Sequence, residues 1–202
     1  MESPPVFLVL NAIYITLGFV KERSRRRETL LYYFAYGSNL HPVRLLERVT
    51  SATLFGVVEL YKHRLEFHKK GQDGSSKCNA VRTEGEFDRV YGALYQVEHD
   101  HKNDLDRIEG VGSGYRDQQI KLHYQGQEYT CFTYFAQSPS IGNNLKPYHW
   151  YKQLVVLGAK HLQFPDAYVQ SIEQVESVED PDETRRTTHE LLIGRILNYS
   201  HI

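Results

Sequence analysis

The heptapeptide FAYGSNL, residues 34–40, joins a run of large apolar residues to three residues that favour turns. A strand that turns through Gly37, Ser38 and Asn39 into a helix would point free backbone N–H groups outward. Such a corner can bind a carboxylate or a phosphate, with help from the dipole of the following helix. The alternative is a plain turn in which Asn39 only caps the helix, and such corners are common. The stretch by itself is therefore compatible with an anion site and with a plain turn.

A second candidate for chemistry is Glu109, in the stretch LDRIEGVGSGYR at residues 105–116. We expect Glu109 to close a short helix, because Gly110 is a residue type that ends helices. An acid there sits at the negative end of the helix dipole, which disfavours its ionised form. A carboxylate of that kind is suited to accept and return a proton near neutral pH. The alternative is a surface glutamate at a fraying helix end.

A third candidate is Tyr151, in the stretch HWYKQLVVLGAK at residues 149–160. The apolar residues Leu154, Val155 and Leu157 predict a helix with one face on a core. Tyr151, near the start of that helix, could point into a cavity, but a buried structural tyrosine would give the same pattern. The chain contains 15 tyrosines, and half-buried strands use tyrosine more often than polar cavities do.

The elements that must position these residues follow from apolar patterns and turn signals. Leu30 to Ala35 is predicted to be a buried strand, and a helix over 41–49 should follow, with Asn39 as its cap and Pro42 in its first turn. The polar stretch KKGQDGSSK, residues 69–77, is predicted to be a loop. Further strands are expected at 52–60, 63–68, 78–82, 90–97, 115–124 and 127–136, and the last two should form a hairpin around Gln125-Gly126. Further helices are expected at 100–108, 148–162 and 165–175, with a final amphipathic turn or two near the C-terminus. Short helices between strands and hairpins predict an α+β fold, with a small mixed sheet or barrel and flanking helices.

Composition is typical of one globular domain, since the chain has 202 residues, 24% charged residues and a net charge of −1. The balanced charge gives no reason to expect nucleic acid as a partner. Cys78 and Cys131 lie far apart and lack the spacing of a metal site. Two free thiols in a reducing compartment are the simplest interpretation, which predicts a cytoplasmic location.

The N-terminal segment is harder to interpret. Residues 6–20 are largely apolar and are followed by the basic stretch KERSRRR at residues 21–27. A secretory signal places its charges before the apolar run, and a spanning helix needs roughly 18 apolar residues or more. We therefore interpret residues 1–28 as an appendage outside a domain of residues 29–202. A weak membrane anchor at 6–20, or translated sequence upstream of the natural start, are the alternatives.

Taken together, the three stretches closely resemble the γ-glutamylcyclotransferase family. YFAYGSNL, then LDxxEGV followed by SG and a tyrosine, then YKxxxxxGA occur here in the order and approximate spacing of that family. The resemblance covers about residues 31–175 and implies a small mixed barrel-like α+β fold with a cavity at its mouth. It assigns the catalytic acid/base to Glu109. It assigns substrate binding to Tyr33, Phe34, Ala35, Tyr36, Gly37, Ser38, Asn39, Leu40, Tyr115 and Tyr151.

The reaction implied by the resemblance converts a γ-glutamyl amino acid into 5-oxoproline and a free amino acid, by attack of the α-amine on the γ-carbonyl. Asn39 makes the loop resemble the enzymes for γ-glutamyl dipeptides more than the glutathione-specific branch. A cyclotransferase for γ-glutamyl amines is an alternative, and so is a non-catalytic binding module on the same fold. The presence of Glu109 favours an enzyme over the module.

Nothing in the sequence calls for a metal, a nucleotide or a redox cofactor, so we expect none. The rival reading is a metal site at His99 and His101 with Glu98 or Asp100. The expected partner is a small γ-glutamyl substrate, and a homodimer is left open.

Overall fold

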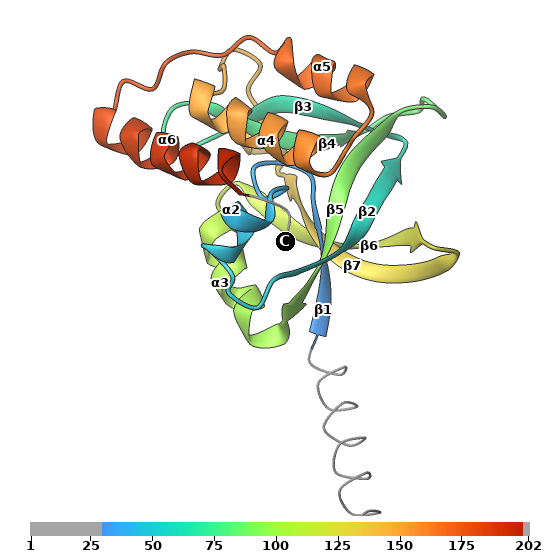
Figure 1. The fold of residues 1–202 in the computed structure, drawn as a ribbon. Coiled ribbons are helices and arrows are strands. Elements are labelled where there is room, and N and C mark those ends of the chain that lie inside the picture. Colours follow the sequence, from blue (N-terminus) through green and yellow to red (C-terminus); the bar gives the residue numbers. More distant parts are fainter. Residues whose placement is uncertain (1–29, 200–202) are drawn as a thin grey trace, which may run out of the picture. The chain divides into compact units, whose positions relative to one another are not determined.

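The computed structural model describes residues 30–199, and its elements are labelled in Figure 1. The predicted appendage, residues 1–28, lies outside the described residues, and so does the apolar run at 6–20. The predicted domain boundary therefore stays a prediction. Between residues 30 and 199, no helix combines the length and the apolar character needed to cross a membrane.

A five-stranded mixed sheet forms the centre of the fold (Figure 1). β1 runs parallel to β7, whereas β2 pairs with β5 and β6 pairs with β7 in antiparallel fashion. A separate antiparallel pair is formed by β3 and β4. In the order of the sheet, its strands are β2 (Thr53–Tyr61), β5 (Arg89–Glu98), β1 (Leu30–Ala35), β7 (Gln127–Ala136) and β6 (Tyr115–Tyr124), and the separate pair is β3 (His63–Lys70) with β4 (Ser76–Arg82).

The two edges of the sheet approach each other without pairing. A side chain on Gly56 of β2 would clash with the ring of Tyr124 of β6, so the strands come close where a glycine allows it. Gly92 of β5 likewise leaves room for the ring of Phe34 in β1. The sheet is thus curled but open, and the predicted mixed, barrel-like α+β fold is confirmed.

Helices cover the sheet and the β3–β4 pair. α4 contacts both α5 and α6, and α2 contacts α6 (Figure 1). The helices are α2 (Pro42–Leu46), α3 (His99–Glu109), α4 (His149–His161), α5 (Asp166–Glu173) and α6 (Glu183–Leu197). The predicted hairpin is also present, since β6 pairs with β7 up to Tyr124 and Gln127, and Gln125 and Gly126 at its turn have positive φ angles of 49° and 78°.

Two helix predictions were wrong in detail. Asn39 does not cap α2; His41 does, with its Nδ1 accepting a hydrogen bond of 3.2 Å from the amide of Val43. α6 spans 15 residues rather than a turn or two. It starts at a cap in which Asp182 accepts from the amide of Arg185, and it is held by burial of apolar side chains that include Leu192.

The predicted loop over residues 69–77 was also wrong. β3 continues through Lys70 and β4 begins at Ser76, so the connection is only residues 71–75. Lys69 and Lys77 face each other in the register of the two strands. The tight turn is stabilised by Asp73, which accepts hydrogen bonds from the amide of Ser75 and from the ammonium of Lys77. The polar residues 69–77, whose composition is typical of a loop, therefore form the end of a β-hairpin.

Candidate active site

The glycine corner lies between β1 and α2 and is fixed from both sides. The amide of Leu40 donates to the carbonyl of Gly37 at 3.1 Å, which closes a turn. The hydroxyl of Tyr95, a buried residue of β5, donates to the carbonyl of Leu40 at 2.8 Å. Within residues 30–199, the amides of Gly37, Ser38 and Asn39 donate to no acceptor. The corner therefore keeps the free N–H groups that an anion site requires.

Two glycines allow this corner to sit against its neighbours. A Cβ on Gly158 of α4 would clash with Leu40 and lie 3.0 Å from the amide nitrogen of His41. A Cβ on Gly37 would lie 3.2 Å from the Cβ of Cys78 in β4. The glycine of the YKxxxxxGA stretch thus has a physical role, since it lets α4 approach the corner.

Glu109 is the last residue of α3, followed by Gly110 in the left-handed conformation at φ 70°, as predicted. Its Oε1 accepts hydrogen bonds from Nδ2 of Asn39 at 2.9 Å and from Nη1 of Arg48 at 2.8 Å. Nη1 of Arg48 also donates to Oδ1 of Asn39 at 3.0 Å, and Nδ2 of Asn39 donates to the hydroxyl of Tyr33 at 3.1 Å. Across the described part of the chain, the second oxygen of Glu109, Oε2, has no hydrogen-bond partner. One oxygen is thus fixed and the other is available.

Arg48 is a member of this site that the sequence did not reveal. Its guanidinium forms an ion pair with Glu109 in which the two side chains are only 19% and 18% exposed. The positive charge of Arg48 therefore lies beside the carboxylate at the C-terminal end of α3. From the sequence, only the position of Glu109 at a helix end could be predicted. A single arginine after a short helix carries no signal that it will meet a residue 61 positions later.

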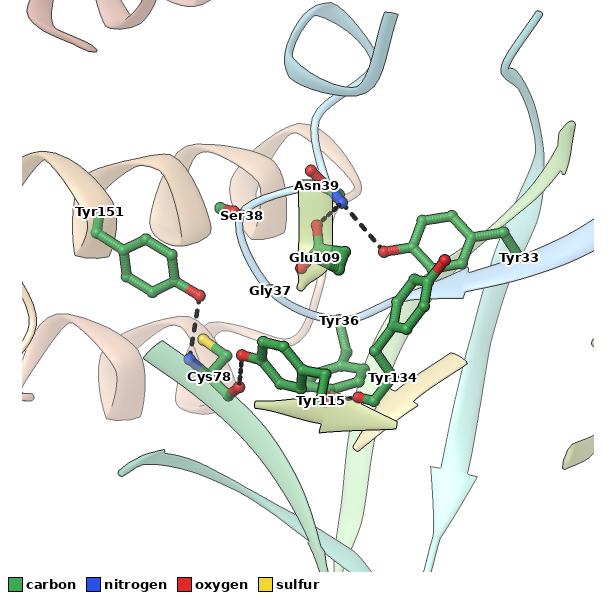
Figure 2. Close-up of a pocket in the computed structure, with 10 residues that line it drawn as sticks. All are labelled: Tyr33, Tyr36, Gly37, Ser38, Asn39, Cys78, Glu109, Tyr115, Tyr134 and Tyr151. Atoms are coloured by element: carbon green, nitrogen blue, oxygen red, sulfur yellow. Dashed lines mark hydrogen bonds between the residues drawn. The ribbon is translucent and has the colours of Figure 1, made fainter. Parts of the chain in front are cut away.

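Glu109 and the corner face one inner cavity, together with several tyrosines (Figure 2). The hydroxyl of Tyr115 donates to the carbonyl of Cys78 at 2.6 Å, and the hydroxyl of Tyr151 accepts from the amide of Cys78 at 3.0 Å. The hydroxyl of Tyr36 donates to the carbonyl of Tyr134. The residues that line the inner cavity are Tyr33, Tyr36, Gly37, Ser38, Asn39, Cys78, Glu109, Tyr115, Tyr134 and Tyr151.

Burial keeps the other ionisable groups of this cavity protonated. It raises the pKa of the Tyr33, Tyr115 and Tyr151 phenols, and it raises the pKa of the Cys78 thiol to about 12. A neutral thiol is a poor nucleophile, so Cys78 is part of the cavity wall rather than a reacting group. Glu109 is the one carboxylic acid among the residues that line this cavity.

The structure brings most of the predicted site residues together. Tyr33, Tyr36, Gly37, Ser38, Asn39, Glu109, Tyr115 and Tyr151 all line the inner cavity. Phe34, Ala35 and Leu40 do not line it and are buried in the core instead. The sequence did not predict a role for Arg48, Cys78 or Tyr134. Cys78 directly follows residues 69–77, which were predicted to be a loop.

A larger outer recess shares part of its lining with the inner cavity. The inner cavity has about 30 Å³ of free volume and the outer recess about 270 Å³. The inner volume is on the scale of a water molecule, so any larger ligand would also occupy the outer recess. Four residues belong to both linings: Ser38, Glu109, Tyr115 and Tyr151. The outer recess adds Arg48, Lys69, Gly71, Gln72, Asp73, Lys77, Arg107, Ile108, Gly110 and Ser113.

The rival metal site does not assemble at the histidines named for it. Nδ1 of His101 lies 2.7 Å from the hydroxyl of Ser51, and His99 is exposed. Over residues 30–199, no three His, Cys, Asp or Glu side chains are arranged to hold a metal ion.

A backbone anion corner that faces one carboxylate across a tyrosine-lined cavity has the composition of an acid–base site for a small acidic molecule. Comparisons with known proteins agree with this class. The AIG2-like family matches residues 89–172. A human protein named gamma-glutamylcyclotransferase is 31% identical over 169 residues, which are 81% of this chain and 87% of the human protein. The bovine protein of the same name is 31% identical over 76% of this chain and 82% of its own length.

A solved structure named gamma-glutamyl cyclotransferase superimposes with a TM-score of 0.69 at 28% identity, covering 82% of this chain and 99% of the other. The chain therefore belongs to the γ-glutamylcyclotransferase family. The family and the enzyme class predicted from the sequence are confirmed.

Proposed function

We propose that this chain converts γ-glutamyl amino acids into 5-oxoproline and the free amino acid. The α-amine of the substrate attacks its own γ-carbonyl carbon. A new C–N bond closes the lactam ring, and the bond from the same carbon to the nitrogen of the leaving amino acid breaks. Because both reacting groups belong to one molecule, the site must mainly fold the substrate into an attack geometry.

We assign the proton transfers to Glu109. The observation that supports this most strongly is the asymmetry of its carboxylate, which is held at Oε1 by Asn39 and Arg48 and has a free Oε2. In this proposal, Oε2 takes a proton from the attacking amine and returns it to the leaving nitrogen, so no net proton is gained or lost by the enzyme. The neighbouring tyrosines and Cys78 keep their protons, as described above.

We assign substrate binding to the corner and to the cavity wall. The amides of Gly37, Ser38 and Asn39 would anchor the carboxylate of the glutamyl group or stabilise the oxyanion that develops on the γ-carbonyl. The rings of Tyr33, Tyr36, Tyr115 and Tyr151 would confine the substrate. The hydroxyls of Tyr115 and Tyr151 already bind Cys78, so we expect these two residues to shape the cavity rather than to donate to the substrate.

The test is to incubate the purified full-length chain with a panel of γ-glutamyl compounds and to measure 5-oxoproline. The panel should contain γ-glutamyl amino acids, glutathione and γ-glutamyl amines. We expect the fastest release from γ-glutamyl amino acids. Faster release from γ-glutamyl amines would favour the amine-specific alternative, and no release from any compound would favour the binding module. Two buried free cysteines in the described part fit a reducing compartment, and we propose the cytoplasm.

A further inference from the structure

Lys69 is a buried cation that faces the outer recess. Lys69 lies on β3, is 8% exposed, and lines the recess together with Glu109. Within residues 30–199, its ammonium forms no hydrogen bond and no ion pair. The ring of Tyr115, whose centroid lies 4.5 Å from Nζ, is the feature beside it. An ammonium removed from water without an anion is unfavourable unless something else compensates it.

The other cations of the recess already have acidic partners. Lys77 donates to Oδ2 of Asp73 at 2.6 Å and to the hydroxyl of Ser75 at 2.6 Å. Arg48 is paired with Glu109, and Arg107 with Asp104. Lys69 is therefore the cation among the recess residues whose charge is not compensated by direct contact with an acid.

The fold makes room for this ammonium. A Cβ on Gly114 would lie 2.8 Å from both Cε and Nζ of Lys69, so the glycine before β6 allows the lysine its position. Burial lowers the pKa of Lys69, which is the expected consequence of charge held away from water, and the charges of Glu109 and Asp73 act in the opposite direction. Lys70, the next residue of the same strand, is exposed.

We propose that Lys69 binds the α-carboxylate of the leaving amino acid, and that it makes the enzyme selective for leaving groups that carry this carboxylate. The inference rests on the proposed function. Glu109 lies on the wall shared by both spaces, so the bond that breaks is beside Glu109 and the leaving group extends into the outer recess. Its α-carboxylate is attached to the carbon next to the leaving nitrogen. A carboxylate there would supply the anion that the Lys69 ammonium lacks.

The experiment compares two substrates that differ only in this carboxylate: γ-glutamyl-alanine and γ-glutamyl-alaninamide. kcat and KM are measured by 5-oxoproline release for the wild type, for Lys69→Met and for Lys70→Met. The wild type should prefer the acid over the amide. Lys69→Met should raise KM for the acid by about 10- to 100-fold, the scale of one charge-assisted hydrogen bond, and should change the amide by less than about threefold. Lys70→Met, an exposed neighbour, should leave both substrates within about twofold.

Three results would overturn the inference. If the wild type uses the amide as well as the acid, the inference is wrong, whether or not Lys69→Met folds. An equal loss on both substrates in a folded Lys69→Met protein would show a general role for Lys69, and the proposed function would stand. Release of 5-oxoproline from neither substrate would remove the proposed function and this inference with it. Retention of the acid preference by Lys69→Arg would support the inference, because the charge is kept.

Discussion

Where the inner cavity meets the outer recess, Glu109, Asn39 and Arg48 hold one another through hydrogen bonds of 2.8 to 3.0 Å. Farther along the outer recess, the ammonium of Lys69 lies over the ring of Tyr115 and, among the described residues, has no hydrogen bond or ion pair. The first arrangement is complete before a substrate arrives, which suits groups that must act on a reacting bond at a fixed geometry. The second is incomplete and would be completed by an anionic ligand. In the proposed mechanism, the first region carries the chemistry and the second recognises the leaving group.

The largest expected effect is at Glu109. In Glu109→Gln, the amide oxygen can still accept from Asn39 and Arg48, so the hydrogen bonds at Oε1 are kept while the proton acceptor is lost. We expect kcat for γ-glutamyl-alanine to fall roughly 100-fold or more, with a smaller change in KM. The measurement is steady-state release of 5-oxoproline, with a thermal melt to show that the variant is folded. A folded variant within a few-fold of the wild type would remove Glu109 from the mechanism.

A smaller loss is expected at Arg48, which fixes the inner network without touching the free oxygen of Glu109. Arg48→Met leaves Oδ1 of Asn39 without its donor and lets the carboxylate move. We expect kcat to fall roughly 10-fold, since small displacements of reacting groups are costly to rate. KM should change less, and Arg48→Lys should recover part of the activity because it restores one donor. A rise in KM at constant kcat would instead place Arg48 with the recognition groups.

Glu109 and Arg48 also show which site residues can be predicted from the sequence and which cannot. Glu109 could be placed at a helix end because Gly110 follows a short amphipathic run, and β1 and the 125–126 hairpin have equally local signals. Arg48 could not be assigned, because its role arises only where the chain after α2 meets the end of α3.

The position of Lys69 could not be predicted for a different reason. Its stretch, KKGQDGSSK, has the composition of a loop, and the strands that extend into it are stabilised by pairing between β3 and β4. Its burial is decided by Gly114 and Tyr115, which come from a distant part of the sequence. Local composition cannot report contacts of that kind.

The next effect concerns the position of the corner relative to α4. Gly158→Ala introduces a methyl group that would clash with Leu40 and crowd the backbone of His41. We expect a loss of about 1–3 kcal/mol in the free energy of unfolding, the usual cost of overpacking, measured by urea denaturation. Gly194→Ala in α6 is the matched control, because no atom lies within 4 Å of its added Cβ. It should be neutral or stabilise by up to about 1 kcal/mol through helix propensity. Equal effects at both glycines would contradict a special contact between α4 and the corner.

The smallest expected effect concerns His189, which lines neither the inner cavity nor the outer recess. His189 of α6 stacks on Trp150 with ring centroids 3.7 Å apart, and its Nδ1 has no hydrogen-bond partner among the described residues. Burial lowers the pKa of His189 to about 4, and the charges of Arg44, Arg48 and Lys77 act in the same direction, opposed by the charge of Asp180.

An unfolded histidine has a pKa near about 6.5, so between that pH and about 4 the unfolded state binds more protons than the folded state. The stability contributed by neutral His189 is therefore fully present above pH about 6.5 and is lost as the pH falls toward 4. His189→Phe keeps an aromatic ring on Trp150 and removes the titration. We expect the free energy of unfolding to decline less from pH 7 to pH 5 in this variant than in the wild type, a range in which most carboxylates stay ionised. Parallel declines in the two proteins would show that His189 takes up its proton as readily when folded as when unfolded. In that case neither burial nor the charges of Arg44, Arg48 and Lys77 would measurably lower the pKa of His189 in the folded protein.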